Sequence, residues 1–127
     1  MDKVAMVSLD VDRGAAVLDA LDRAKLKISV AIWMYSSEYE DWRLVLAARQ
    51  FHSLDPRGPL RLLYGLLAKA GFTPETTPPI LILPMTDPFI RELRRLFAKA
   101  KNVEGMRLGG QMIGDRFVED AYVYRVV

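Results

Sequence analysis

The most continuous apolar pattern in the chain lies in two neighbouring runs, residues 28–35 and 42–48, in which almost every residue is apolar or small. β-Branched and aromatic residues dominate both runs, and a short polar stop at residues 36–41 separates them, so the pattern predicts a β-hairpin. A strand with one solvated face alternates apolar and polar residues, whereas these strands are apolar on both faces. We therefore expect the hairpin at the middle of a sheet that is covered on both sides.

The polar stop also indicates how the two strands pair. If Tyr35 lies opposite Trp42, alternate residues fall on opposite faces of the sheet. One face then carries Trp33, Tyr35, Trp42 and Leu44, and the other carries Ile32, Met34, Arg43 and Val45. A shift of one residue in the register would exchange the two groups.

Apolar residues recur at helical spacing in three other parts of the chain. Asp12 is a candidate N-cap for a first helix over residues 14–26; its inward positions would be Ala15, Leu18, Leu21 and Ala24. A second helix should end before Gly71, a typical residue just after a helix C-terminus; its inward positions would be Leu60, Leu63, Leu66 and Leu67. A third should begin at residues 86–88 and run to about Lys101; its inward positions would be Phe89, Leu93, Leu96 and Phe97.

Three further segments are candidate strands. Residues 3–9 fit either a strand or the approach to the first helix, and we favour the strand. Residues 80–83 lie between prolines and predict a short, fully buried strand, parallel to a strand of the hairpin because a helix lies between them. A second hairpin should turn at Gly114 and Asp115. That register places Met106, Leu108 and Met112 opposite Val123, Ala121 and Phe117 on one apolar face.

The predicted order is (β)αββαβαββ, which indicates a layered α/β fold at the border of α+β, with a mixed sheet of five or six strands and three helices. The length of 127 residues and the 51% hydrophobic content are those of a single globular domain over residues 1–127. The sequence has no cysteine, which fits a reducing compartment, and no apolar run of the ~20 residues that span a bilayer. We therefore expect a cytoplasmic protein with no membrane segment.

Few groups suggest catalysis, and we expect neither a catalytic residue nor a cofactor. His52 is the only histidine. Ser53 and Asp55 are its neighbours in one loop, and loop neighbours do not converge as a catalytic triad requires. The glycine-rich run at residues 107–114 matches no phosphate-binding motif and is better explained by a hairpin turn.

Carboxylates offer one alternative. Asp10, Asp12, Glu40 and Asp41 together could form an oxygen-ligand site for Mg²⁺, as in a metal-dependent hydrolase or nuclease. Helix capping explains Asp12 and turn formation explains Asp41 without any metal, so we expect no metal site.

A basic helical face offers another alternative. The predicted third helix carries Arg91, Arg94, Arg95 and Lys99 on its polar side. Such a face suits nucleic acid, although most charge runs of this kind are simply solvated. The formal net charge of only +2 gives no further support to a nucleic-acid-binding protein.

The residues that we favour for function are Trp33, Tyr35, Trp42 and Arg43 of the first hairpin. Aromatic residues at such a place usually belong to the core. However, we expect three modest helices to leave part of a doubly apolar hairpin uncovered, and aromatic residues and arginine are enriched at the centre of protein interfaces. The first hypothesis is therefore a non-enzymatic domain that associates with itself, as a homodimer, or with a protein partner.

The runs LDVDRG at residues 9–14, AIWMY at residues 31–35 and DWRLV at residues 41–45 resemble a family of small, uncharacterised bacterial proteins of similar length. The resemblance covers roughly the first half of the chain. It implies a bacterial, cytosolic, stand-alone domain, and it transfers no activity and no catalytic residue.

Overall fold

The computed structural model describes residues 6–38, 40–52, 54–55 and 57–127. Within these residues the chain forms three α-helices, one short 3-10 helix and seven strands, and this order confirms the predicted one from the first helix onward. The elements are α1 (Ser8–Arg23), β1 (Val30–Ser36), β2 (Asp41–Ala47), η1 (Arg49–Phe51), α2 (Gly58–Lys69), β3 (Ile80–Ile82), α3 (Pro88–Leu96), β4 (Arg107–Leu108), β5 (Gln111–Ile113), β6 (Arg116–Val118) and β7 (Asp120–Val126). The fold is of the α+β type.

Five strands form one mixed sheet in the order β3-β2-β1-β7-β4, so the predicted hairpin occupies its middle. Tyr35 pairs with Trp42 across the hairpin, which confirms the predicted register. β1 also pairs with β7, and both partners run antiparallel to it. β3 runs parallel to β2, as expected for two strands joined through a helix.

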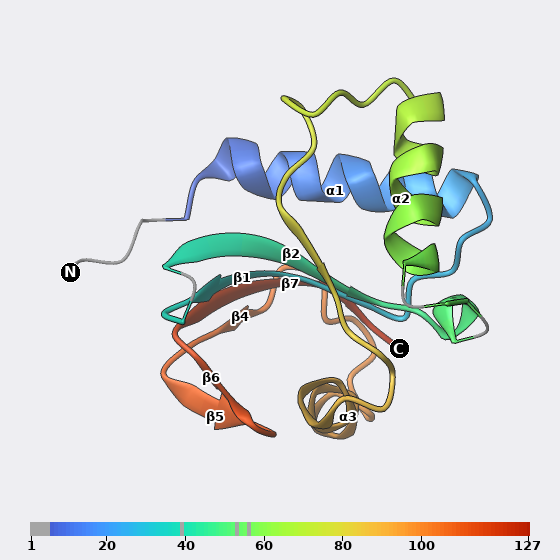
Figure 1. The fold of residues 1–127 in the computed structure, drawn as a ribbon. Helices are drawn as coiled ribbons and strands as arrows, with labels where there is room; N and C mark the ends of the chain where they lie inside the picture. Colours follow the sequence, from blue (N-terminus) through green and yellow to red (C-terminus); the bar gives the residue numbers. More distant parts are fainter. Residues whose placement is uncertain (1–5, 39, 53, 56) are drawn as a thin grey trace.

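The sheet is covered on both faces, as the doubly apolar hairpin required. Figure 1 shows α1 and α2 on one side of the sheet, and α3 with the small β5–β6 sheet on the other. Each side has its own apolar core. The first contains Val17, Leu21, Trp33, Trp42, Leu44, Leu46, Leu63 and Leu67. The second contains Ile32, Met34, Val45, Phe89, Ile90, Leu93, Ile113, Val118 and Val123.

The first helix begins earlier than predicted. α1 starts at Ser8 after Val7, and Asp12 lies inside it rather than capping it. The strand expected over residues 3–9 is therefore wrong in its described part: Met6 and Val7 have no regular structure, and residues 1–5 lie outside the described residues. Val11 packs against the same core as the buried face of α1, three residues before Gly14, so it belongs to the helical stripe.

The inward faces of the helices are narrower than predicted. In α1 the buried residues are Gly14, Val17, Leu18 and Leu21, whereas Ala15 and Ala24 are exposed. In α2 only Leu63 and Leu67 are buried, and Leu60 is 43% exposed. Each helix packs on the sheet through one stripe, because a single flat layer contacts only one side of a cylinder.

The third helix begins as predicted and ends sooner. The backbone N–H of Phe89 donates a 2.9 Å hydrogen bond to the Asp87 carboxylate, which caps α3. α3 ends at Leu96, which is exposed, rather than near Lys101. Val103 is buried in the same core as Phe89, so the chain must leave the helix axis before residue 103 to return to the sheet.

The second hairpin has the predicted register and turn, with Met112 opposite Phe117 and Leu108 opposite Ala121. At the tip of the hairpin, however, the face that packs on the core is the one opposite to the predicted apolar face. Ile113 and Val118 are fully buried, while Met112 and Phe117 are 62% and 49% exposed. The hairpin bends at Gly109, whose missing Cβ would lie 2.8 Å from the Glu119 carbonyl oxygen, so the β5–β6 tip folds over towards α3.

Candidate functional site

Trp33, Tyr35 and Trp42 form one aromatic cluster on the α1 side of the sheet. The Trp33 and Trp42 rings are stacked, with centroids 5.9 Å apart and an interplanar angle of 13°. Tyr35 contacts Trp42 edge-on at 5.7 Å. The three side chains are only 3%, 5% and 8% exposed, and they pack in the same core as residues of α1. The chain thus covers the hairpin surface that the sequence offered as an interface.

Arg43, the fourth residue of that predicted interface, does not belong to the aromatic cluster. Its neighbour Trp42 points to the α1 side, and alternate side chains of a strand point to opposite faces. Its guanidinium Nε lies 3.3 Å from Oδ1 of Asp41 and donates a hydrogen bond to it.

Asp10 is the candidate carboxylate that shares a cavity with the two tryptophans of the aromatic cluster. A cavity of about 310 Å³ beside the start of α1 is lined by Asp10, Trp33 and Trp42, together with residues of the loop before β3. Sequence reasoning treated the acidic and aromatic residues as separate hypotheses, because no local pattern indicated that α1 would lie across the hairpin.

The open edge of the sheet forms a larger apolar groove. β3 is the outermost strand next to β2, and its three residues are half-buried, so the prediction of a fully buried strand over residues 80–83 is wrong for residues 80–82. A cavity of about 600 Å³ is lined by Ile80, Leu81, Ile82 and Leu83. Because consecutive side chains of a strand point to opposite faces, a cavity that all four line must lie along the strand's edge.

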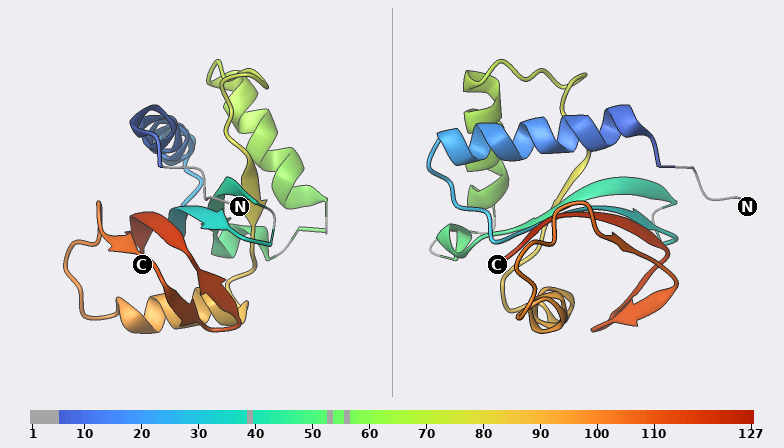
Figure 2. Two further views of the ribbon diagram at one scale, coloured as in Figure 1. Left: turned by 90° about the vertical axis from the view of Figure 1, so that its left-hand side faces the viewer. Right: turned by 180° about the vertical axis from the view of Figure 1, so that it is seen from behind.

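The outer wall of this edge groove comes from the segment after β2 and the start of α2. Leu54 and Leu60 line it, and both are exposed, at 38% and 43%. The left view of Figure 2 shows α2 and the segment that returns through β3 on the same side of the molecule, away from β4. The prolines on both sides of residues 80–83 were the sequence signal for an edge strand, because proline is confined to sheet edges.

The basic residues of the third helix are only partly available to a ligand. Arg95 forms an ion pair with Glu92, and Arg94 donates a 3.0 Å hydrogen bond to the Val127 carbonyl oxygen. Lys99 lies beyond the end of α3, so it does not continue the helical face of Arg91. The four residues do not form one continuous basic stripe.

The remaining candidates do not assemble into a catalytic centre. In the part of the chain that the structure describes, no group of three or more His, Asp or Glu side chains is placed to hold a metal ion. His52 is exposed and lines the edge groove together with Asp55, while Ser53 lies outside the described residues. The described helices include none that is both long and apolar enough to cross a membrane.

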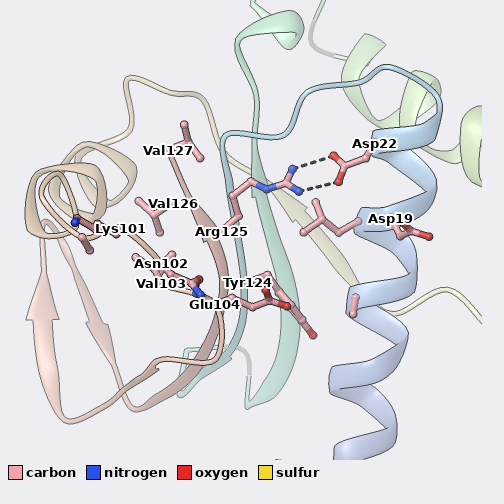
Figure 3. Close-up of a pocket in the computed structure, with 13 residues that line it drawn as sticks. Asp19, Asp22, Lys101, Asn102, Val103, Glu104, Tyr124, Arg125, Val126 and Val127 are labelled. Atoms are coloured by element: carbon pink, nitrogen blue, oxygen red, sulfur yellow. Dashed lines mark hydrogen bonds and ion pairs between the residues drawn. The ribbon is translucent and has the colours of Figure 1, made fainter.

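A polar cleft of about 370 Å³ lies between α1 and the end of β7 (Figure 3). Arg125 binds the Asp22 carboxylate there through two hydrogen bonds of 2.9 and 2.7 Å, and it also donates to the Ile28 carbonyl oxygen at 3.2 Å. These hydrogen bonds lower the pKa of Asp22 below its ordinary value. This ion pair joins α1 to β7. Because the charges of Asp22 and Arg125 neutralise each other, Arg125 is not a free cation for a ligand.

Comparison of the chain with protein-family models, with curated proteins and with solved structures finds no match. The resemblance to small bacterial proteins therefore stays a prediction, and any functional assignment must come from the geometry of the edge groove and the cavities.

Proposed function

We propose that this protein is a self-associating interaction domain and that two copies pair through the open edge of β3. The observation that carries the proposal is the edge groove, in which an unpaired strand edge lies beside an apolar cavity of about 600 Å³. A sheet edge of this kind is a template for a further strand, and the cavity offers room for apolar side chains of the incoming chain.

The hydrogen bonds between β2 and β3 define which groups are available for pairing. The Pro79 carbonyl oxygen accepts from the Leu44 N–H at 2.7 Å, and the Leu83 N–H donates to the Leu46 carbonyl oxygen at 3.0 Å. Since backbone groups alternate in direction along a strand, the N–H and C=O groups of Leu81 also point to β2. The N–H and C=O groups of Ile80 and Ile82 then point to the open edge.

These two residues suit a second copy of the same strand. In an antiparallel pair with its two-fold axis at Leu81, Ile80 of one copy lies opposite Ile82 of the other. Two such pairs form, and each exchanges two hydrogen bonds. The prolines at residues 78, 79 and 84 limit the usable edge to these residues, so another β3 would satisfy it completely.

The absence of charged side chains along the β3 edge also favours a two-fold contact. Such a contact brings a residue near its own copy, so like charges at its centre would repel. Residues 78–84, PPILILP, contain no charged side chain, although edges of monomeric proteins are often protected by lysine or another charge. His52 and Asp55 are the titratable residues among those that line the groove.

The test is sedimentation equilibrium or native mass spectrometry of three proteins over a range of concentrations. The unmodified protein should form dimers, and Leu60→Asp should shift it to monomer because a carboxylate would enter the apolar contact. Leu62→Asp is the matched control: Leu62 lies on the same helix and is 37% exposed, but it does not line the groove.

A second variant tests the backbone pairing itself. Ile82→Pro removes an N–H that points away from β2, so it should weaken the dimer and leave the β2–β3 pairing in place. A protein that stays monomeric at all concentrations, or a Leu60→Asp variant that dimerises as well as Leu62→Asp, would refute the proposal.

A further inference from the structure

The cavity beside the start of α1 is distinct from the edge groove and has different chemistry. It has a volume of about 310 Å³, at the lower end of the range of about 300–1,000 Å³ that is usual for ligand pockets. Trp33, Trp42, Pro78 and Pro79 supply its apolar lining, and Asp10, Arg13 and Glu75 supply its charges. We call it the aromatic cavity.

The stacked tryptophan pair gives the aromatic cavity a specific preference. The two indole rings are packed against each other and are almost entirely covered, at 3% and 8% exposure. The side chains are therefore fixed in place before any ligand binds. Indole attracts cations more strongly than the other aromatic rings, because of the electron-rich face of its π-system.

The charges around the opening favour the same kind of ligand. Asp10 and Glu75 are acidic and Arg13 is basic, so these three side chains together carry a charge of −1. The Arg13 guanidinium lies 3.9 Å from the Asp10 carboxylate, at the limit of an ion pair. Among the described residues, Glu75 forms no ion pair. An incoming cation would thus meet one unpaired carboxylate and one weakly paired carboxylate.

We infer that the aromatic cavity binds a small organic cation that carries apolar groups. A quaternary ammonium compound and the side chain of a lysine or arginine from a protein share this chemistry. The carboxylates of Asp10 and Glu75 balance the charge of the cation, the small exposed part of each indole contacts it, and the two prolines contact its apolar substituents. This inference is independent of pairing through β3.

The protein carries its own reporter for this site. Trp33 and Trp42 are its only tryptophans, so intrinsic tryptophan fluorescence comes from the cavity alone. The cationic probes are choline, Nα-acetyl-lysine amide and Nα-acetyl-arginine amide. Choline represents a free quaternary ammonium compound, and the two amides represent protein side chains, so separate titrations distinguish the two sources. The neutral control is 3,3-dimethylbutanol, which has the shape of choline without its charge.

At least one cationic probe should change the emission saturably, in the millimolar range, and the neutral control should not. Glu75→Gln and Asp10→Asn should each raise Kd about threefold, while Arg13→Gln should lower it about threefold because it removes the competing cation. Asp19→Asn, which changes another exposed carboxylate of α1 outside the cavity, should have no effect.

The opposite signs expected for Glu75→Gln and Arg13→Gln separate ligand binding from a general effect on the fold. Three outcomes would overturn the inference: no saturable change with any cationic probe, equal binding of 3,3-dimethylbutanol, or a Kd that is the same in Glu75→Gln and the unmodified protein.

Discussion

The Tyr124 side chain occupies the space that a Cβ atom on Gly14 would need. The Tyr124 hydroxyl also donates a 2.7 Å hydrogen bond to the Val11 carbonyl oxygen, one turn earlier in α1. Burial raises the pKa of this hydroxyl, so it stays a donor across the physiological range. Glycine at position 14 thus allows α1 to approach β7 closely enough to cover the aromatic cluster.

The first prediction compares Gly14 in α1 with Gly65 in α2. Gly14→Ala should lower the free energy of unfolding by about 1–3 kcal/mol, because the new methyl group overlaps the Tyr124 ring. Gly65→Ala in α2 is the matched control: its Cβ would meet open space, so the better helix former should raise stability by about 0.5–1 kcal/mol. Urea unfolding of both variants measures the difference. Equal effects in the two helices would contradict this packing.

The second prediction tests whether Tyr124 is the cause of the cost at Gly14. Tyr124→Phe alone should cost about 1 kcal/mol, since it removes the hydrogen bond to Val11. In the Tyr124→Phe background, Gly14→Ala should cost less than it does alone, because the hydroxyl is the atom that its Cβ approaches most closely. Additive costs in this double-mutant cycle would mean that Gly14 is constrained by something else.

The third prediction concerns pH. Arg125 lowers the pKa of Asp22, so the folded state favours the charged carboxylate more than the unfolded state does. The stabilisation of the folded state by the Asp22–Arg125 pair is fully present above the pKa of Asp22 in the unfolded chain, about 3.9. It is lost as the pH falls through the lower pKa of Asp22 in the folded state. Asp22→Asn should therefore cost up to about 1 kcal/mol near neutral pH, a value limited by solvent screening of this half-exposed pair, and progressively less below about pH 4.

Unfolding by urea at several pH values measures this effect. The control is the same substitution in an Arg125→Gln background, where Asp22→Asn should no longer change stability in a pH-dependent way. A constant cost of Asp22→Asn across the acid range would show that the ion pair does not contribute through the charge of Asp22.

The fourth prediction concerns the turn of the second hairpin. Gly110 and Gly114 both have positive φ angles, of 68° and 60°, which strain any other residue. A Cβ on Gly114 would also meet the Pro88 carbonyl group at the start of α3, whereas a Cβ on Gly110 would meet nothing. Gly114→Ala should therefore destabilise the protein by about 1–3 kcal/mol more than Gly110→Ala. Thermal unfolding of the two variants would detect this difference as a lower Tm for Gly114→Ala.

Several elements follow directly from local sequence. The register of the first hairpin was predictable because two apolar runs separated by one short polar stop leave few ways to pair Tyr35 and Trp42. The start of α3 just after its cap Asp87, and the glycine after α2 at position 71, followed from capping chemistry, which depends on adjacent residues only. The opposite faces of Trp33 and Met34 followed from the period of two in a strand.

Other features depend on contacts between distant parts of the chain. Whether Trp33 and Trp42 are exposed was not determined by the hairpin, because it depends on how closely α1 can approach, and that depends on Gly14 facing Tyr124. Met112 and Phe117 are exposed because the hairpin bends at Gly109 and buries Ile113 and Val118 instead. The strand pairing of a hairpin defines which side chains share each of its two faces. It does not determine which of the two faces the rest of the chain will cover.

The sequence by itself therefore determined the three helices, the order of the main elements and the central hairpin, because hydrophobic periodicity and capping are local properties. Only the tertiary structure decided that residues 80–82 form an open edge beside an apolar groove, and that Asp10 and Glu75 meet the tryptophan pair. Both decisions rest on the order of strands in the sheet and on the path of α1 across it. These long-range arrangements minimise exposed apolar surface for the chain as a whole, and no short segment encodes them.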